Sequence, residues 1–279
     1  DKLSSLQYSL SDDQALFSSI TSVFSDHNIT SKQSSNSNNE AIFIVGMPRT
    51  GTTLVERILT NHTDVTSAGE LQNFGQLFKQ FSQTSSSRVI DQETVIASQE
   101  INFETLGKAY IESTRVLTGK TAKFIDKMPL NILYAGFILT ALPNAKIICL
   151  DRNPLDTIMS NYKQLFSINQ SYYNYSYSLA WTAEYYVLFN NLMKFWQQMF
   201  PDNFYIINYD ALVNAPEQEA RKFTNFCHLP WQQACLHITK NTSPVATASA
   251  VQVRQPISKS SINNWKNFDQ YLDDVKLRL

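Results

Sequence analysis

A short loop between two apolar segments carries the clearest chemistry in the sequence. Residues 41–59 read AIFIVGMPRTGTTLVERIL, in which Gly46 and Gly51 enclose a loop that contains Arg49. Backbone N–H groups in such a loop, and at the start of the helix behind it, attract an anion without help from a side chain. The planar guanidinium group of Arg49 fits two oxygens of a phosphate or sulfate. The loop therefore predicts a binding site for a phosphate-like group.

This loop differs from the P-loop of nucleoside triphosphatases at one position. The P-loop motif reads GxxxxGK[ST], and here Thr52 stands where the lysine belongs, followed by Thr53. The positive charge lies earlier, on Arg49. We interpret the segment as a site for a nucleotide or another anionic group. The alternative is a strand-to-helix turn whose glycines serve geometry alone.

The segment ICLDRNPLDTIMSNY carries a second basic group. An apolar run ends at Arg152, Asn153 is a favourable N-cap, and Pro154 suits the first helical position. Arg152 is therefore expected at the carboxyl end of a strand, where ligands bind in open parallel sheets and where the first loop must also lie. Ser160, two turns into the following helix, could join it in binding a second phosphate. The alternative for Arg152 is a surface ion pair with Asp156.

Short apolar runs alternate with helical patterns along the chain. Strand candidates follow the first one at residues 122–126, 145–151 and 203–208. A long helix is predicted between the last two, with a buried stripe of residues mostly three or four apart: Leu179, Tyr185, Leu188, Leu192, Phe195 and Met199. This order predicts an α/β fold, a P-loop-type three-layer domain with a mostly parallel central sheet flanked by helices.

The two ends of the chain are predicted to differ from this domain. Residues 13–25 have helical spacing, and the sequence SKQSSNSNNE at 31–40 is typical of a flexible linker. We therefore expect a helical appendage and polar linker over 1–39 and the main domain over 40–279. At the other end, Trp265, Phe268 and Leu272 are spaced as in a packing helix, which indicates a core contact or a homodimer contact.

Composition excludes several other classes of function. The formal net charge of the 279 residues is −1, so no nucleic-acid partner or acidic membrane surface is expected. Three cysteines and four histidines form no metal-ligand pattern, and Cys149 lies in an apolar run that predicts core. No transmembrane segment or signal peptide is visible, which favours a soluble reducing compartment such as the cytoplasm. The chain begins without methionine, as a fragment would.

Five motifs in order then resemble a known family. GMPRTGTTLVERIL with SAGEL, FIDKMPLN, CLDRNPLDTIMSNY, YDALVNAPEQEARKFTNFCHLPW and QVRQPISKSSINNW are similar to sulfotransferases that use 3′-phosphoadenosine 5′-phosphosulfate (PAPS) and release adenosine 3′,5′-bisphosphate (PAP). The similarity runs from about residue 41 to 265. It is strongest to protein-tyrosine sulfotransferases and to bacterial sulfotransferases linked to tetratricopeptide repeats.

The resemblance implies donor-binding roles for residues in four segments. These residues are Arg49, Thr50, Gly51, Thr52, Thr53, Arg152, Ser160, Tyr209, Ser249, Arg254 and Lys259. By this resemblance, residues 49–53 bind the 5′-phosphosulfate, Arg152 and Ser160 bind the 3′-phosphate, and Tyr209 lies against the nucleotide. Ser249 also contributes to the donor site, and Arg254 and Lys259 lie on the loop that closes over the nucleotide in similar proteins.

The resemblance also implies the catalytic groups. Glu70, in a Gly-Glu pair after the loop helix, corresponds to the catalytic base, and Lys127 assists the leaving group together with Arg49. A carboxylate within hydrogen-bond reach of an acceptor hydroxyl can remove its proton while the oxygen attacks sulfur in line. His62 is a rival base by residue type, although similar proteins keep such a histidine for structure. Because the leaving group is a stable phosphate, no metal is expected.

Two other functions remain open. Asp151 could hold magnesium at the end of a Walker B strand in a kinase or NTPase, and a scaffold domain could bind a nucleotide without catalysis. The expected acceptor is a hydroxyl group of a tyrosine, a glycan or a small phenol or alcohol. The tyrosine-rich segment from Tyr172 to Tyr177 could contact that acceptor or be a partly buried loop.

Overall fold

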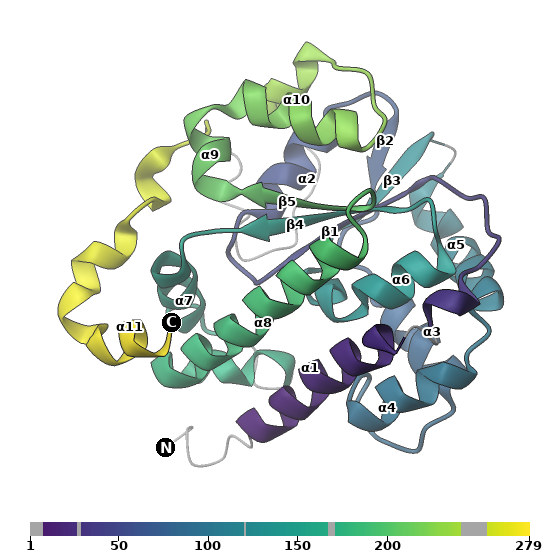
Figure 1. Ribbon diagram of the computed structural model, residues 1–279. Coiled ribbons are helices and arrows are strands. Elements are labelled where there is room, and N and C mark those ends of the chain that lie inside the picture. Colours follow the sequence, from purple (N-terminus) through teal and green to yellow (C-terminus); the bar gives the residue numbers. More distant parts are fainter. Residues whose placement is uncertain (1–7, 27–28, 120, 167–170, 241–255) are drawn as a thin grey trace.

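Parallel strands form the centre of the molecule, with helices on both sides (Figure 1). The structure is a computed structural model that describes residues 8–26, 29–119, 121–166, 171–240 and 256–279. The strand order is β2-β3-β1-β4-β5, and each neighbouring pair is parallel. The strands are β1 (Ala41–Gly46), β2 (Val65–Ser67), β3 (Lys123–Asp126), β4 (Lys146–Asp151) and β5 (Phe204–Asn208). This confirms the predicted α/β class with a parallel central sheet.

Four of these strands lie where the apolar runs predicted them. The sequence did not reveal β2, because three residues are too few for the two-residue period of a strand to show. β1 lies in the middle of the sheet, with Gly46 opposite Leu150 of β4 and Phe43 opposite Asp126 of β3. The central strand therefore delivers the glycine loop between the ends of β3 and β4.

The two faces of the sheet bury separate cores. Phe43 and Val45 of β1 belong to one core, whereas Ile42 and Ile44 belong to the other, as the pleat of a strand requires. The second core is covered by α2 (Thr52–Thr60), α9 (Tyr209–Asn214) and α10 (Pro216–Phe226). The first is covered by α1 (Leu10–Ser25), α3 (Asn73–Ser82), α4 (Gln92–Ala97), α5 (Phe103–Thr118), α6 (Ala135–Ala141), α7 (Pro154–Tyr162) and α8 (Leu179–Met199).

The N-terminal helix is packed into the first core. Phe17, Ile20 and Phe24 of α1 are buried, and the helix contacts α4 and α8. The polar segment after it makes defined contacts: the N–H of Ser34 donates to the carbonyl of Thr140 at 2.9 Å. Serine and asparagine side chains there bind nearby backbone N–H groups, which explains how a polar sequence follows a fixed path. The boundary near residue 40 remains a prediction.

The long helix α8 is confirmed, but its buried stripe differs from the predicted one. Of the predicted stripe, Tyr185 and Leu192 are buried, and Leu188 is only partly buried. The buried face also includes Phe189 and Trp196. Because α8 is apolar on more than one side, spacing alone did not identify the side that meets the sheet.

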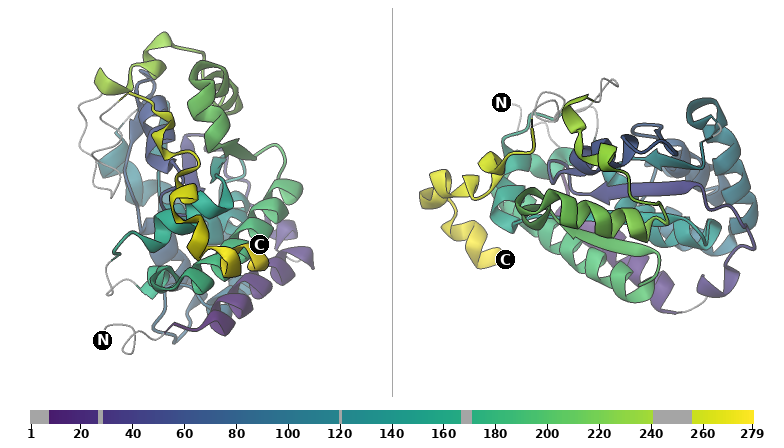
Figure 2. Two further views of the ribbon diagram at one scale, coloured as in Figure 1. Left: turned by 90° about the vertical axis from the view of Figure 1, so that its left-hand side faces the viewer. Right: turned by 90° about the horizontal axis from the view of Figure 1, so that it is seen from above.

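The carboxyl ends of the strands meet at one edge of the sheet. The segments that leave β1, β3, β4 and β5 there begin with Met47, Lys127, Arg152 and Tyr209. The C-terminal segment 256–279, which ends in α11 (Asp273–Arg278), crosses the same edge (Figure 2, yellow). None of the helices described is long and apolar enough to cross a membrane.

Candidate active site

The loop after β1 is held by three side chains that bind its carbonyl oxygens. The carbonyls of residues 47–49 accept hydrogen bonds from Thr50, Asn161 and Arg152, at 2.7, 2.8 and 2.8 Å in that order. The N–H groups of Gly51 and Thr52 donate to no protein acceptor within the described residues. They stand at the start of α2, where backbone donors lack partners inside the helix. The loop therefore offers donors for an anion while its acceptors are already occupied.

The backbone of this loop adopts a conformation that few side chains tolerate. Arg49 has φ +67°, in the left-handed region, and Gly51 has φ +107°. Strain of this kind in a non-glycine residue persists where surrounding contacts enforce it, and here the enforcing contact is the bond from Arg152 to the Arg49 carbonyl. Gly51 also lies directly under the ring of Tyr209, since a Cβ atom there would lie 2.5 Å from Tyr209 Cδ2. Its lack of a side chain allows this close approach.

Arg152 is the central cation of the site. Its side chain is 7% exposed, its guanidinium lies 4.9 Å from the centre of the Tyr209 ring, and its second terminal nitrogen donates to the Ser261 carbonyl at 2.5 Å. The Nε–H group is buried and has no partner within the described residues. The alternative ion pair with Asp156 is not formed, because Asp156 accepts the N–H groups of Asn263 and Trp265 at 2.8 and 2.9 Å. The helix start at Asn153 and Pro154 is as predicted.

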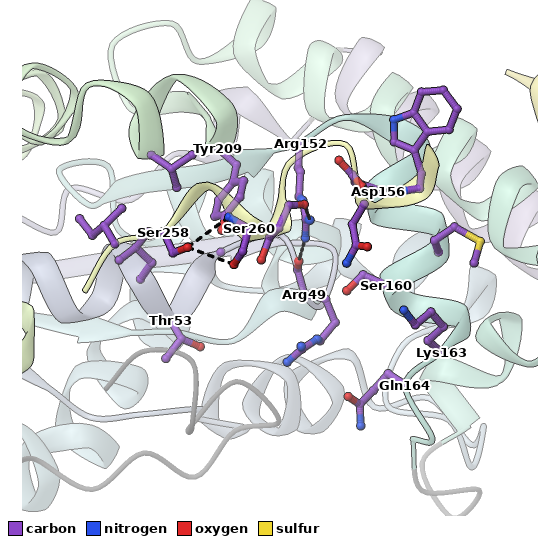
Figure 3. A pocket seen from close by; sticks show the side chains of 18 of the residues that line it. Arg49, Thr53, Arg152, Asp156, Ser160, Lys163, Gln164, Tyr209, Ser258 and Ser260 are labelled. Carbon is purple, nitrogen blue, oxygen red and sulfur yellow. Dashed lines mark hydrogen bonds between the residues drawn. The ribbon is translucent and has the colours of Figure 1, made fainter. Parts of the chain in front are cut away.

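A cavity of about 410 Å³ opens beside these groups (Figure 3). Six of the predicted donor-binding residues line it: Arg49, Gly51, Thr53, Arg152, Ser160 and Tyr209. Thr50 of the loop and Thr52 at the start of α2 are buried and do not line the cavity. Lys259 is exposed and does not line it either, although its neighbours Ser258 and Ser260 do. Ser249 and Arg254 lie outside the described residues.

Some cavity-lining residues were not expected at the site. Trp265 and Phe268 pack against the first core, as predicted, and they also line the cavity from a 3-10 helix at Asn264–Tyr271, which the sequence did not indicate. Lys163 lines it from the end of α7. Helical spacing indicated only that these aromatic rings share a side. The contact that places them is the pair of N–H groups bound by Asp156, and local sequence carries no signal for it.

The cavity is electrostatically suited to an anion. Arg49 and Arg152 lie close together, and burial, with the neighbouring Arg152 charge, lowers the pKa of Arg49. No carboxylate forms an ion pair with Arg152 in the described part of the chain. Two arginines that repel each other in a partly buried site are stabilised when a multiply charged anion lies between them.

Glu70 and Lys127 form an ion pair at the ends of neighbouring strands. Lys127 follows β3 and is 1% exposed, whereas the Glu70 side chain follows β2 and is 39% exposed. The pair does not line the large cavity. It lies close to α2, because Glu56 of that helix, whose pKa is raised by burial, feels the charges of both residues. The structure thus brings together the predicted base, Glu70, and the lysine predicted to assist the leaving group, Lys127.

A buried aspartate supports this pair from behind. Asp126 is fully buried and accepts from the Tyr110 hydroxyl at 2.7 Å and from the N–H of Leu71, the residue after Glu70, at 3.4 Å. The N–H of Lys127 donates to the Gly69 carbonyl at 2.9 Å. These bonds fix the turn that carries Glu70 against the end of β3.

His62, the rival base, has a structural position. Its Nε2 lies 2.8 Å from the Pro230 carbonyl, and its Nδ1 accepts the N–H of Asp64. It stands beyond the far end of α2, about 13 Å along the helix from the loop by the rise of 1.5 Å per residue. Among the described residues, no group of three or more His, Cys, Asp or Glu side chains could hold a metal ion.

Comparison with known proteins identifies the family. A model described as the sulfotransferase family matches residues 41–233, which include β1, the glycine loop, Glu70, Lys127 and Arg152. The chain belongs to the sulfotransferase family. The match covers all five strands of the sheet and ends before the segment that covers the cavity.

Relatives differ in how much of their length the chain spans. The chain is 34% identical over 238 residues to an uncharacterised protein of Aquifex aeolicus, covering 84% of this chain and 31% of that protein. It is 24% identical to a protein-tyrosine sulfotransferase of Drosophila melanogaster, covering 80% and 46%. It is 25% identical to protein-tyrosine sulfotransferase A of Caenorhabditis elegans, covering 86% and 65%. The chain therefore spans less than two thirds of each of these sulfotransferase relatives.

Solved structures share the sulfotransferase fold. A sulfotransferase domain from the Synechococcus PCC 7002 olefin synthase has a TM-score of 0.57 at 16% identity, covering 84% of this chain and 90% of that domain. A sulfotransferase domain from the curacin biosynthetic pathway has a TM-score of 0.51 at 18% identity, covering 83% and 92%. At such identities the likeness concerns the fold alone.

Proposed function

We propose that this chain transfers a sulfuryl group from PAPS to an acceptor hydroxyl and releases PAP. The observation that carries this proposal is the Nε–H of Arg152, a buried cationic donor without a partner at the wall of an anion-suited cavity. The indole N–H of Trp265 at the same cavity is also buried without a partner in the described residues. A buried donor left unpaired costs about 1–3 kcal/mol. A ligand rich in phosphate oxygens would remove that cost.

The residues of the cavity fit a nucleotide with two phosphate groups. Arg152 and Ser160, from the start and middle of α7, would bind the 3′-phosphate. Tyr209, already stacked under the Arg152 guanidinium, would contact the nucleoside. The loop N–H groups and Arg49 would bind the 5′-phosphosulfate. The ligand carries roughly four negative charges near neutral pH, which matches a site in which cations lie close together.

Glu70 and Lys127 would carry out the transfer. The donor supplies an activated sulfuryl group, and the protein must remove a proton on one side and stabilise charge on the other. Glu70 is exposed enough to reach an acceptor hydroxyl and remove its proton. Lys127 and Arg49 would stabilise the charge that develops on the leaving 5′-phosphate oxygen. Since two relatives of this chain are called protein-tyrosine sulfotransferases, a tyrosine hydroxyl is one candidate acceptor.

Thermal unfolding with nucleotides tests the donor. A ligand that binds only the folded state stabilises it by about 2.7 kcal/mol at a hundred times its Kd. We expect a rise in Tm with PAP in the absence of magnesium and no comparable rise with ATP. Stabilisation only by ATP with magnesium would favour the kinase or NTPase, with Asp151 as a magnesium ligand. PAP binding without turnover on any acceptor would favour the non-catalytic scaffold.

A further inference from the structure

A second, smaller cavity lies between α3 and the segment that follows Lys127. Its volume is about 90 Å³, and its walls are mostly apolar. The principal lining side chains are Leu71, Val89, Met128, Leu133, Tyr134 and Tyr172. Gly75 of α3 completes the wall, since a Cβ atom there would lie 3.1 Å from the Tyr134 hydroxyl oxygen and 3.3 Å from Val89 Cγ1. The glycine therefore leaves room that any other residue would reduce.

Both reactive side chains belong to segments that run into this cavity. Leu71 directly follows Glu70, and Met128 directly follows Lys127. From a third segment, Tyr172 lines the cavity and precedes Tyr173, whose pKa is raised by burial and further by the Glu70 carboxylate. Three separate segments thus bring the cavity next to the ion pair.

One tyrosine of the cavity wall, Tyr134, offers its hydroxyl group to a ligand. Tyr134 is 5% exposed and lines the cavity, and its hydroxyl forms no hydrogen bond with any described residue. Its ring is held by the rings of Phe74 and Phe78, with centroids 5.9 and 5.4 Å away. The hydroxyl is therefore fixed in place, and a ligand with a hydrogen-bonding atom would complete it.

We propose that this cavity binds the acceptor, and that the acceptor is a compact apolar phenol or alcohol with a hydrogen-bonding atom at its far end for Tyr134. This rests on the proposed sulfuryl transfer and names its substrate class. An apolar cavity of about 150 Å³ holds benzene, so this smaller one would take only the far end of a single ring, whose reacting hydroxyl stays outside it at Glu70. A glycan would lose hydrogen bonds to water along these walls. A tyrosine within a polypeptide would have to bury its main chain beside Tyr134.

Two acceptors of equal size give the test. 4-Methoxyphenol and 4-ethylphenol differ only in whether the far end offers an oxygen to Tyr134. We expect the purified chain with PAPS to sulfate both, with kcat/KM about fivefold to tenfold higher for 4-methoxyphenol, the effect of one hydrogen bond of about 1 kcal/mol. Tyr134→Phe should bring that ratio close to one. Tyr271→Phe, at a tyrosine that is 65% exposed and outside this cavity, should keep the ratio.

A second pair of variants tests the size of the cavity. Gly75→Ala should lower kcat/KM for both phenols at least several-fold, because its Cβ meets the Tyr134 oxygen. Adding Tyr134→Phe removes that oxygen and should restore part of the activity with 4-ethylphenol. PAP-induced stabilisation shows in each variant that the fold and donor site are intact. Lack of PAP binding in the unmodified chain would contradict the proposed function itself. With PAP bound, a preference for glycans or tyrosine peptides, no activity on either phenol, or a ratio unaffected by Tyr134→Phe would overturn the acceptor assignment.

Discussion

The ammonium group of Lys127 contacts the Glu70 carboxylate, and the two side chains differ greatly in exposure, at 1% for lysine and 39% for glutamate. A buried lysine is costly unless an opposite charge accompanies it. Here the lysine cation lies inside the protein, and the glutamate carboxylate is partly exposed to solvent. The pair is therefore oriented so that Glu70, the proposed base, would meet an acceptor first, while the lysine remains near α2.

Glu70→Gln should abolish most turnover and preserve nucleotide binding. The amide keeps the size of the side chain and still accepts a hydrogen bond from Lys127, but it cannot take the acceptor proton. We expect turnover to fall on the order of a hundredfold or more, with PAP affinity by calorimetry within about twofold of the unmodified chain. Near-normal turnover with intact binding would show that another group is the base.

Arg152→Lys should weaken PAP binding although the charge is kept. The guanidinium already donates to two carbonyl groups, those of Arg49 and Ser261, and a lysine ammonium cannot hold both and bind a phosphate. We expect calorimetry to show a loss of about tenfold to a hundredfold in affinity, as for charge-assisted hydrogen bonds.

The matched control for this change is Arg221→Lys. Arg221 stacks on the Trp231 ring at 4.4 Å, and it lies on α10 outside the cavity. Its replacement should leave PAP affinity unaltered. Equal losses in the two variants would show that PAP does not rely on Arg152.

Gly51→Ala should destabilise the loop and its contact with Tyr209. The alanine must adopt φ +107° and also place Cβ 2.5 Å from the Tyr209 ring. We expect the free energy of unfolding to fall by about 2–4 kcal/mol in urea titrations, the sum of backbone strain and overpacking. Gly119→Ala is the matched control, since Gly119 has φ +60° and nothing within 4 Å of an added Cβ. If both variants lost the same stability, the ring contact would contribute nothing.

The sequence predicted those parts of the site that depend on local signals. The glycine pair around Arg49 and the Asn153-Pro154 helix start can each be recognised within a few residues. The rule that parallel strands end at one edge then brings Arg49, Lys127 and Arg152 to the same side of the sheet. This is why the fold class was predicted correctly and why Arg49 and Arg152 were expected at one edge of the sheet, where both line the cavity.

Contacts between distant segments could not be predicted in this way. Asn161 binds the Pro48 carbonyl across 113 positions of sequence, and Asp156 binds the Trp265 N–H across 109. Neither residue type indicates such a partner. The segment around Trp265 takes its place at the cavity from these bonds, so helical spacing assigned it to the core.

The tyrosine-rich segment shows the same limit. Tyr175 is buried, stacks on Tyr185 with centroids 3.9 Å apart, and donates to Asn161. Tyr172 is 36% exposed, whereas Tyr173 and Tyr175 are buried, and Tyr172 lines the smaller cavity. The interpretation as a buried loop therefore holds for Tyr173 and Tyr175, whereas Tyr172 lines the cavity that we propose for the acceptor, a difference that the composition of the segment could not show.

Asp126→Asn should change how stability depends on pH. Burial raises the pKa of Asp126 to about 7, against an ordinary value of about 3.9 in an unfolded chain. Because the folded protein holds this proton more tightly than the unfolded chain, the contribution of this group to the free energy of unfolding is greatest below about pH 4. It is lost as the pH rises toward 7, and it amounts to about 4 kcal/mol at 1.36 kcal/mol per pKa unit.

The asparagine does not titrate and still accepts from the Tyr110 hydroxyl. The variant therefore does not lose this part of its free energy of unfolding as the pH rises. Urea titrations at pH 5 and pH 8 should show that the stability of Asp126→Asn relative to the unmodified chain increases with pH. Asp202→Asn, at an exposed position, should show no such trend. A difference between Asp126→Asn and the unmodified chain that is the same at both pH values would mean that Asp126 is ionised throughout. The carboxylate would then brace Leu71 and the Glu70 turn as an anion, and turnover between pH 5 and 8 would not reflect its protonation.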